Sequence, residues 1–258
     1  MKQQYFLCYS GNKKDEVEQI YETLDFSGID TVIEPFAGTS AMSYYIWKKH
    51  PTMKFILNDN NPFFKGIFES IRSGAYVELH AEIMAIYHRV KEDKEAYKLA
   101  VKDEGLPQMI LRHKYYSIHP GLFPQENGRE KKRLTPVMEK WRFEDAPIFE
   151  FFRNADITFL CEDWQGVYEA NQNKQTLFLF DPPYLMSNND YYLNRTFNVY
   201  EYFYHNKPEI SRVYFIIEKL WITDILFKGW NVKEYAVKYK QSHKKTTHAI
   251  YTNAPNLG

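Results

Sequence analysis

Short apolar segments recur along the chain, and turn-forming residues such as Gly, Pro, Asn and Asp stand between many of them. The run 177–180, Leu-Phe-Leu-Phe, contains no polar residue, which is typical of a strand buried on both faces of a parallel sheet. Segments with helical periodicity alternate with these runs, and this alternation predicts an α/β fold with a mostly parallel sheet and helices on both faces. The expected strands are 31–33, 55–57, 157–160, 177–180, 213–217, 232–237 and 248–251.

The spacing of the expected elements indicates an insertion in the sheet domain. A helical stretch over about 77–101 opens the insertion, a basic loop follows to about residue 141, and the strand pattern then resumes. We therefore expect a domain made of 1–74 and 151–258 and an inserted, mainly helical subdomain at 75–150. The helices expected before the insertion are 16–24, 41–49 and 63–71.

The chemistry at the end of the 177–180 run is the most informative feature of the sequence. Asp181-Pro182-Pro183-Tyr184 follows it directly, where open α/β sheets bind ligands. Asp181 and the Pro182 carbonyl can each accept a hydrogen bond from an exocyclic amine, and Tyr184 can stack on the face of a base. These groups suit in-line transfer of a methyl group from S-adenosylmethionine to the amine. The alternative is a plain strand-ending turn that contains an aromatic residue.

A second segment with ligand-binding character lies near the start of the chain. Strand 31–33 leads into Glu34-Pro35-Phe36-Ala37-Gly38-Thr39-Ser40, here called the 34–40 loop, and then into a helix. Gly38 allows close backbone approach to a ligand, and Glu34 can hold a cationic or hydroxyl-bearing group. Strand 55–57 ends in Asn58-Asp59, where an acid is placed to bind ribose hydroxyls. A doubly wound fold that binds another nucleotide is the alternative.

These residues, in this order, resemble the DNA adenine-N6 methyltransferase family of the Dam type. The N-terminal segment 9–13 is similar to a cofactor-binding segment of that family, Asp163-Trp164 to its acid-aromatic pair beside the cofactor adenine, and 247–253 to its closing strand. The resemblance implies a Rossmann-like class I methyltransferase sheet, with the insertion as DNA-recognition subdomain. The implied catalytic residues are Asp181, Pro182, Pro183 and Tyr184. The implied cofactor-binding residues are Tyr9, Gly11, Lys13, Glu34, Pro35, Phe36, Gly38, Thr39, Asp59, Asp163, Trp164 and Asp181.

The sequence departs from the family pattern at two turns. The family usually has glycine where this chain has Asn12 and Ser40. Asn tolerates a positive φ, and Ser can donate a hydrogen bond to a ligand, so both residues suit a turn. The departures bear on cofactor affinity more than on the type of reaction.

Charge is unevenly distributed although the formal net charge is zero. The segment 112–142 carries eight Lys or Arg residues against three Glu, and 228–245 carries six Lys against one Glu. Such stretches can neutralise the phosphates of double-stranded DNA, although two solvated faces are the alternative. The expected DNA-binding residues are Arg112, Lys114, Arg129, Lys131, Lys132 and Arg133. The polar, aromatic stretch 187–192 is interpreted either as a lid over a flipped base or as a surface loop.

Length and composition agree with one compact enzyme. A chain of 258 residues can bury a sizeable core in an α/β domain that carries an insertion. No apolar run reaches the ~20 residues that cross a bilayer, and the N-terminus lacks a signal-peptide pattern, so we expect a soluble intracellular protein without a membrane partner. The two cysteines, Cys8 and Cys161, have no metal-site spacing, and we expect them to be packing residues and the protein to need no metal.

The sequence therefore favours a site-specific DNA adenine-N6 methyltransferase that acts on a flipped base. Three alternatives stay open: a methyltransferase of RNA or protein, a catalytically weak or silent DNA-binding subunit with the same fold, and a generic nucleotide-binding module. The last is disfavoured because the chain has no phosphate-binding lysine loop of the P-loop kind.

Overall fold

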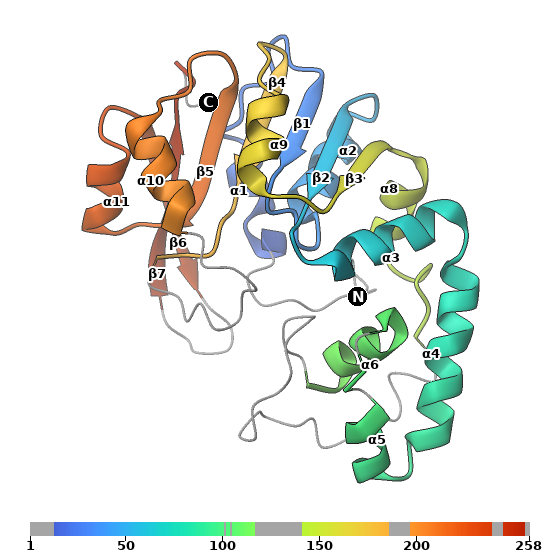
Figure 1. Cartoon of the computed structure of the whole chain (residues 1–258). Coiled ribbons are helices and arrows are strands. Elements are labelled where there is room, and N and C mark those ends of the chain that lie inside the picture. The colour runs from blue at the N-terminus through green and yellow to red at the C-terminus, as the bar shows by residue number, and fades with distance from the viewer. Residues whose placement is uncertain are drawn as a thin grey trace. The chain divides into compact units, whose positions relative to one another are not determined.

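The computed structural model describes residues 13–100, 102–103, 105–116, 141–185, 197–238 and 245–255 (Figure 1). The chain divides into two compact units. The sheet unit comprises Lys13–Asn60 and Ala155–Gly258, and the described part of the other, the helical unit, lies within Asn61–Asn154.

The sheet unit contains a seven-stranded mixed sheet in the order β3-β2-β1-β4-β5-β7-β6. The strands from β3 to β5 pair in parallel, and β7 pairs antiparallel with both β5 and β6. This sheet confirms the predicted Rossmann-like α/β fold, and each expected strand is present, extended at its ends by polar residues that join the ladder. The strands are β1 (Thr31–Glu34), β2 (Lys54–Asn58), β3 (Asp156–Leu160), β4 (Thr176–Phe180), β5 (Arg212–Glu218), β6 (Asn231–Lys238) and β7 (Lys245–Thr252).

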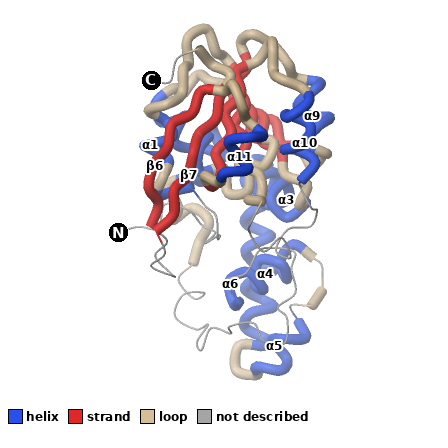
Figure 2. Tube along the Cα trace, turned by 90° about the vertical axis from the view of Figure 1, so that its left-hand side faces the viewer, coloured by secondary structure: helices blue, strands red, loops and turns tan. Residues whose placement is uncertain are grey.

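Helices cover both faces of this sheet (Figures 1 and 2). On one face, Phe178 and Phe180 of β4 pack in an aromatic-rich core with side chains of α9 (Trp164–Ala170) and α10 (Phe197–His205). The short α11 (Trp221–Leu226) lies on this face too, whereas α1 (Val17–Tyr21) and α2 (Ala41–Lys49) cover the other. All five residues of β4 are buried, because helices enclose that strand on both sides.

The first helix is shorter than the predicted 16–24. A 3-10 turn, η1 (Lys13–Asp15), precedes α1, which ends at Tyr21. The Thr23 hydroxyl donates to the Ile20 carbonyl over 2.6 Å, so a side chain takes up one of the carbonyls at the end of the helix.

The helical unit contains α3 (Pro62–Ser73), α4 (Tyr76–Val90), α5 (Lys94–Ala100), α6 (Leu106–Tyr116) and α8 (Ile148–Asn154). The stretch expected at 77–101 is two helices, because the Asp93 carboxylate accepts hydrogen bonds from the backbone amides of Glu95 and Ala96 and starts α5. Phe68 of α3 stacks on Phe152 of α8 with ring centroids 4.1 Å apart. The unit thus takes in α3 and α8 together with the helices of the expected insertion.

Several predicted features fall outside the described residues. They are the basic loop beyond α6 and the polar stretch 187–192. Along the part of the chain that is described, no helix combines the length and the apolar character that crossing a membrane requires.

Candidate active site at the carboxyl edge of the sheet

The acidic residues that the sequence places after separate strands come together at one edge of the sheet. Strand β1 pairs in parallel with β2 on one side and with β4 on the other, and β2 pairs in parallel with β3. Their carboxyl ends therefore share an edge, which carries Glu34, Asp59, Asp163 and Asp181. Carboxylates grouped beside an aromatic residue suit a ligand that combines a cationic group with a flat ring.

Asp181 forms an ion pair with Lys13 of η1. The Lys13 Nζ atom lies 2.7 Å from Asp181 Oδ2, and Lys13 is only 6% exposed whereas the Asp181 side chain keeps 23% exposure. Sequence reasoning assigned Lys13 to the cofactor, and its contact with the predicted catalytic acid could not be seen from residues so far apart in the chain.

Burial and neighbouring charges shift the pKa values of Asp181 and Lys13 in opposite directions. Burial raises the pKa of Asp181, and the Lys13 ammonium opposes that rise. For Lys13, burial alone would lower the pKa, but the charges of Asp181 and Glu16 raise it above its usual value. Lys13 thus stays charged and favours the ionised form of Asp181.

The residues after Asp181 are held from two sides. Pro182 and Pro183 are buried, and the Pro183 carbonyl accepts a hydrogen bond of 3.1 Å from the Tyr200 hydroxyl of α10. Tyr184 is partly buried, and Lys13 Nζ lies over its ring, 5.1 Å from the centroid. The Pro182 carbonyl is therefore fixed between two constrained residues, whereas the Pro183 carbonyl is already used inside the protein.

Glu34 is buried at the end of β1, where it meets the start of α2. Its Oε1 atom accepts hydrogen bonds from the Ser43 backbone amide, over 2.8 Å, and from the Ser43 hydroxyl. Burial raises the pKa of Glu34 to about 7 although these hydrogen bonds act to lower it. Ser43 is a partner that the sequence pattern did not suggest.

The 34–40 loop turns through two left-handed residues. Gly38 has φ +48°, and its amide donates to Asp59 Oδ2 over 3.0 Å, which links the loops after β1 and β2. Ser40 has φ +55°, a conformation that favours glycine. The Ser40 hydroxyl is buried and has no hydrogen-bond partner among the described residues. Thr39 and Pro35 are buried beside them, and Phe36 is partly buried.

Asn58 joins the loops after β1 and β3. Its Nδ2 donates to the Pro35 carbonyl over 3.0 Å and to the Glu162 carbonyl over 3.1 Å, and its Oδ1 accepts from the Glu162 amide over 2.9 Å. One buried amide therefore fixes the backbone on both sides of β2. The sequence placed Asn58 next to Asp59 but gave no sign of this role.

The Asp163-Trp164 pair has one polar and one packed member. Asp163 is exposed, and its Oδ1 caps α9 by accepting from the Gln165 amide over 2.9 Å. Trp164 is buried and contacts the rings of Phe36 and Phe180, with centroids 6.4 and 6.1 Å away. Within the part of the chain that the structure describes, its indole Nε1 has no hydrogen-bond partner.

The other predicted site residues are not placed beside this edge by the structure. Tyr9, Gly11, Arg129, Lys131, Lys132 and Arg133 lie outside the described residues, and for Arg112 and Lys114 the structure gives the backbone of α6 alone. Among the described side chains, no group of three or more His, Cys, Asp or Glu residues is arranged to hold a metal ion.

Three residues that the sequence did not single out lie close to the Lys13-Asp181 pair. They are Glu16, Tyr235 and His248, which come from α1's N-terminal cap, β6 and β7. Only His248 fell in a segment with family resemblance. Tyr235 and His248 meet because of the pairing register of β6 and β7, here called the final hairpin. The alternation of apolar and polar residues in the sequence does not by itself determine that register.

Comparison with known proteins gives a matching family model and similar solved structures. A family model described as D12 class N6 adenine-specific DNA methyltransferase matches residues 9–143, just over half of the chain. No curated protein matches the sequence. Among solved structures, the chain is similar to precorrin-6y C5,15-methyltransferase from Geobacter metallireducens GS-15, with 10% sequence identity and a TM-score of 0.38, over 95% of this chain and 91% of that one.

Proposed function

The chain belongs to the D12 class of N6 adenine-specific DNA methyltransferases, and from that premise we propose that it methylates a flipped adenine at a specific site in double-stranded DNA. The family gives the reaction class and the DNA substrate. The observation that supports the proposal most is the position of Asp181. It lies at the shared carboxyl edge of β1 and β4, next to Tyr184 and on the same edge as the other acids at the strand ends.

Asp181 and Tyr184 have distinct roles in this proposal. The ionised Asp181 carboxylate accepts a hydrogen bond from the exocyclic amine and aims the nitrogen lone pair, while the Pro182 carbonyl accepts the second hydrogen. The ring of Tyr184 stacks on the extruded base and replaces part of the stacking lost from the duplex. Asp181 need not remove the proton first, because the amine nitrogen loses it readily once it has become cationic.

The edge residues fit S-adenosylmethionine, which supplies an electrophilic methyl group on a sulfonium centre when it is bound. Gly38 has no side chain on a backbone with positive φ, which allows close approach of a ligand. Asp181 supplies negative charge for a cation, Glu34 can hold a cationic or hydroxyl-bearing group, and Asp59 and Asp163 are placed at strand ends that suit ribose and adenine. We propose that these residues, with Lys13, Pro35, Phe36, Thr39 and Trp164, bind the cofactor together with Tyr9 and Gly11.

The proposal is tested with the purified full-length chain, S-adenosylmethionine and mixed-sequence duplex DNA. Sequencing of methylated bases is expected to find N6-methyladenine at one recurring sequence, and parallel reactions with RNA and protein are expected to incorporate no methyl group. Methylation of RNA or protein in place of DNA would overturn the proposal.

Asp181→Ala is the matching variant, because it removes the carboxylate that orients the amine. It is expected to lower methylation by at least about 1,000-fold, while calorimetry shows cofactor binding largely kept. Asp25→Ala is the control. It also removes a carboxylate from an ion pair, the 3.3 Å contact with Arg212, but Arg212 begins β5 and so lies at the opposite edge of the sheet. Full activity of Asp181→Ala would refute the role of Asp181.

A further inference from the structure

Glu16, Tyr235 and His248 form a hydrogen-bonded group, here called the Glu16 cluster. The Glu16 Oε2 atom lies 2.9 Å from the Tyr235 hydroxyl and 2.7 Å from His248 Nδ1. Burial alone would raise the pKa of Glu16, but the hydrogen bonds and charges around it lower that pKa. The carboxylate is therefore ionised and only accepts, so Nδ1 of His248 carries the proton in this contact.

The fold brings the three residues together through one hairpin and one turn. Tyr235 of β6 and His248 of β7 are register partners, so their side chains leave the hairpin on the same face. Glu16 occupies the N-cap position of α1, and its amide donates to the Lys13 carbonyl over 2.7 Å. Lys13 is thus attached through one backbone turn to a carboxylate held by two hairpin side chains.

The Glu16 cluster interacts with two residues near Asp181, which are Lys13 and Tyr184. The negative charge of Glu16 raises the pKa of Lys13, as the charge of Asp181 does. The His248 ring meets the Tyr184 ring edge to face, with centroids 5.2 Å apart, and the Tyr235 ring meets His248 in the same way at 5.7 Å. His248 is fully buried, so it cannot turn away from this arrangement without repacking the hairpin.

We propose that Glu16, Tyr235 and His248 are positioning residues for methyl transfer: they hold Lys13 against Asp181 and fix the Tyr184 ring. This inference rests on the proposed function for its effect on catalysis, but its effect on Lys13 does not depend on any activity. None of the three residues is assigned to the cofactor, and the contact of Lys13 at issue is the one with Asp181, so loss of the cluster lowers kcat more than it weakens cofactor binding.

The test compares two tyrosine hydroxyls on the same hairpin. Tyr235→Phe removes one hydrogen bond to Glu16, whereas Tyr251→Phe removes the hydroxyl that bonds to Asp224 over 2.8 Å, away from the Glu16 cluster. Glu16→Gln removes the charge. His248→Asn keeps a donor near the place of Nδ1, and His248→Leu does not, so this pair separates positioning from packing.

Two quantities are measured for each full-length variant. The first is kcat and KM for S-adenosylmethionine with duplex DNA. The second is the rate at which an acetylating reagent modifies Lys13, followed by peptide mass spectrometry, which needs no activity. Tyr235→Phe and Glu16→Gln are expected to lower kcat about tenfold with KM changed less than about twofold, and to speed Lys13 acetylation several-fold. Tyr251→Phe is expected to change neither quantity, and His248→Asn to keep more kcat than His248→Leu.

The outcomes separate this inference from the proposed function. Unchanged Lys13 acetylation in Tyr235→Phe and Glu16→Gln overturns the inference, as does an unchanged kcat in an active enzyme. If the wild-type chain methylates no DNA, the proposed function fails. Even then, faster acetylation of Lys13 in Tyr235→Phe and Glu16→Gln, but not in Tyr251→Phe, supports the inference that the Glu16 cluster positions Lys13.

Discussion

Ionised Asp181 accepts a hydrogen bond from an amine more strongly than the neutral acid does, and at the scale of single residues Lys13 opposes the rise in the pKa of Asp181. We predict that Lys13→Met lets that pKa rise further, so that the variant loses methylation at neutral pH and regains part of it as pH increases. The measurement is kcat against pH for the wild type and the variant.

Lys13→Arg is the control for this prediction, because it keeps the positive charge. Its profile is expected to stay closer to that of the wild type. Cofactor affinity measured by calorimetry at each pH separates an effect on Asp181 from an effect on binding. A profile of Lys13→Met that is lower than the wild type by the same factor at every pH contradicts the prediction.

Glu34 makes stability depend on pH. Its pKa is about 7 in the folded protein, against 4.5 as the reference. Between these values the unfolded chain releases a proton that the folded protein keeps, so the free energy of unfolding falls as pH rises and levels off above about 7. Glu34→Gln lacks this loss. In denaturant unfolding, the free energy of unfolding of this variant is expected to exceed that of the wild type by up to about 3 kcal/mol above pH 7. Below about pH 5 the two proteins are expected to differ little. An equal stability difference at both pH values contradicts it.

Ser40 carries two local costs in the 34–40 loop. A non-glycine residue at φ +55° costs about 1 kcal/mol, and a buried hydroxyl that no described residue bonds costs about as much again. Ser40→Gly removes both, against about 0.5–1 kcal/mol for the added freedom of the unfolded chain, so we expect it to raise stability by about 1 kcal/mol. Ser40→Ala keeps the positive φ and serves as the comparison in thermal unfolding. A less stable Ser40→Gly would contradict the expectation.

The residues at the edge of the sheet could be predicted from sequence only in part. Glu34, Asp59, Asp163 and Asp181 were found because each follows an apolar run that ends in a turn. The contact of Lys13 with Asp181 and that of Ser43 with Glu34 were not predicted, because the partners come from other elements, and only the packing of those elements brings them together. The sequence therefore identifies the acids at the strand ends better than the residues that hold them in place.

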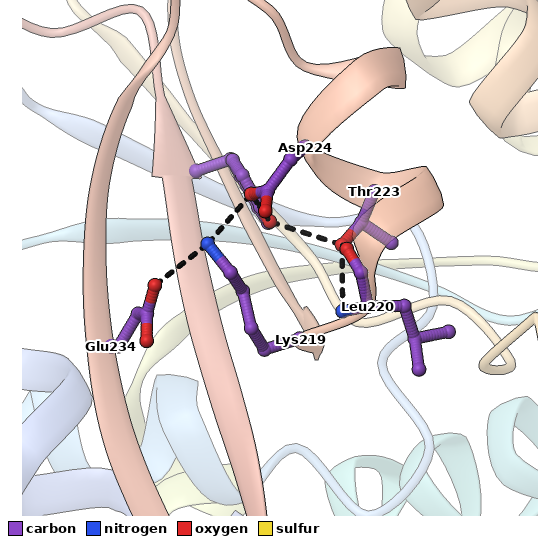
Figure 3. Close-up of polar contacts among 6 residues, drawn as sticks. Lys219, Leu220, Thr223, Asp224 and Glu234 are labelled. Atoms are coloured by element: carbon purple, nitrogen blue, oxygen red, sulfur yellow. Dashed lines mark hydrogen bonds and ion pairs between the residues drawn. The ribbon is translucent and has the colours of Figure 1, made fainter.

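At the scale of elements, a group of polar contacts fastens α11 to the final hairpin (Figure 3). Lys219 Nζ lies 2.6 Å from both Asp224 of α11 and Glu234 of β6. Asp224 also accepts a hydrogen bond of 2.8 Å from the Tyr251 hydroxyl of β7. A single lysine thus bridges a helix and a strand.

We predict that Lys219→Met loosens α11 more than it lowers global stability. The two carboxylates are about half exposed, at 48% and 50%, so the ion pairs contribute about 1 kcal/mol together. Hydrogen exchange of the α11 amides is expected to speed up several-fold. Lys228→Met, which changes an exposed lysine just after the helix, is the control and is expected to leave that exchange unchanged. Equal exchange in both variants would count against the bridge.

Strands were predicted better than helices for a physical reason. A parallel strand buried on both faces is a continuous apolar run, as 177–180 is, and its short length and the turn residues beside it distinguish it from a buried helix. Helix α10 has the sequence Phe-Asn-Val-Tyr-Glu-Tyr-Phe-Tyr-His, whose aromatic residues also favour strands. Helices α9 and α11 are short, and their periodicity is too brief to read.

At the scale of the whole molecule, two separate observations support methyl transfer, namely the family match and the chemistry of segment 181–184. The family model matches residues 9–143, which include the 34–40 loop and Asp59 but end before Asp181. The segment 181–184 therefore supports methyl transfer by its own chemistry and by its place next to β1. The matched range also reaches into the helical unit, which we propose as the DNA-recognition part of the protein.

The basic loop gives a prediction for the complete chain. Replacing Lys131, Lys132 and Arg133 by Ala is expected to weaken DNA binding and to reduce the slope of log affinity against log salt by up to about 3. The control replaces Lys48, Lys49 and Lys54, which are exposed in the sheet unit, and removes the same charge. Fluorescence anisotropy over a range of salt concentrations measures both. Equal slopes for the two triple variants would assign the effect to net charge alone.

The bridging amide of Asn58 has a consequence for attempts to adapt this protein to synthetic methyl donors. A substitution that moves the loop of Pro35 or the loop of Glu162 outward lengthens a hydrogen bond of the Asn58 side chain in either case. Single substitutions in either loop will thus show epistasis with substitutions in the other, and directed evolution will progress through paired changes or through replacement of Asn58 itself.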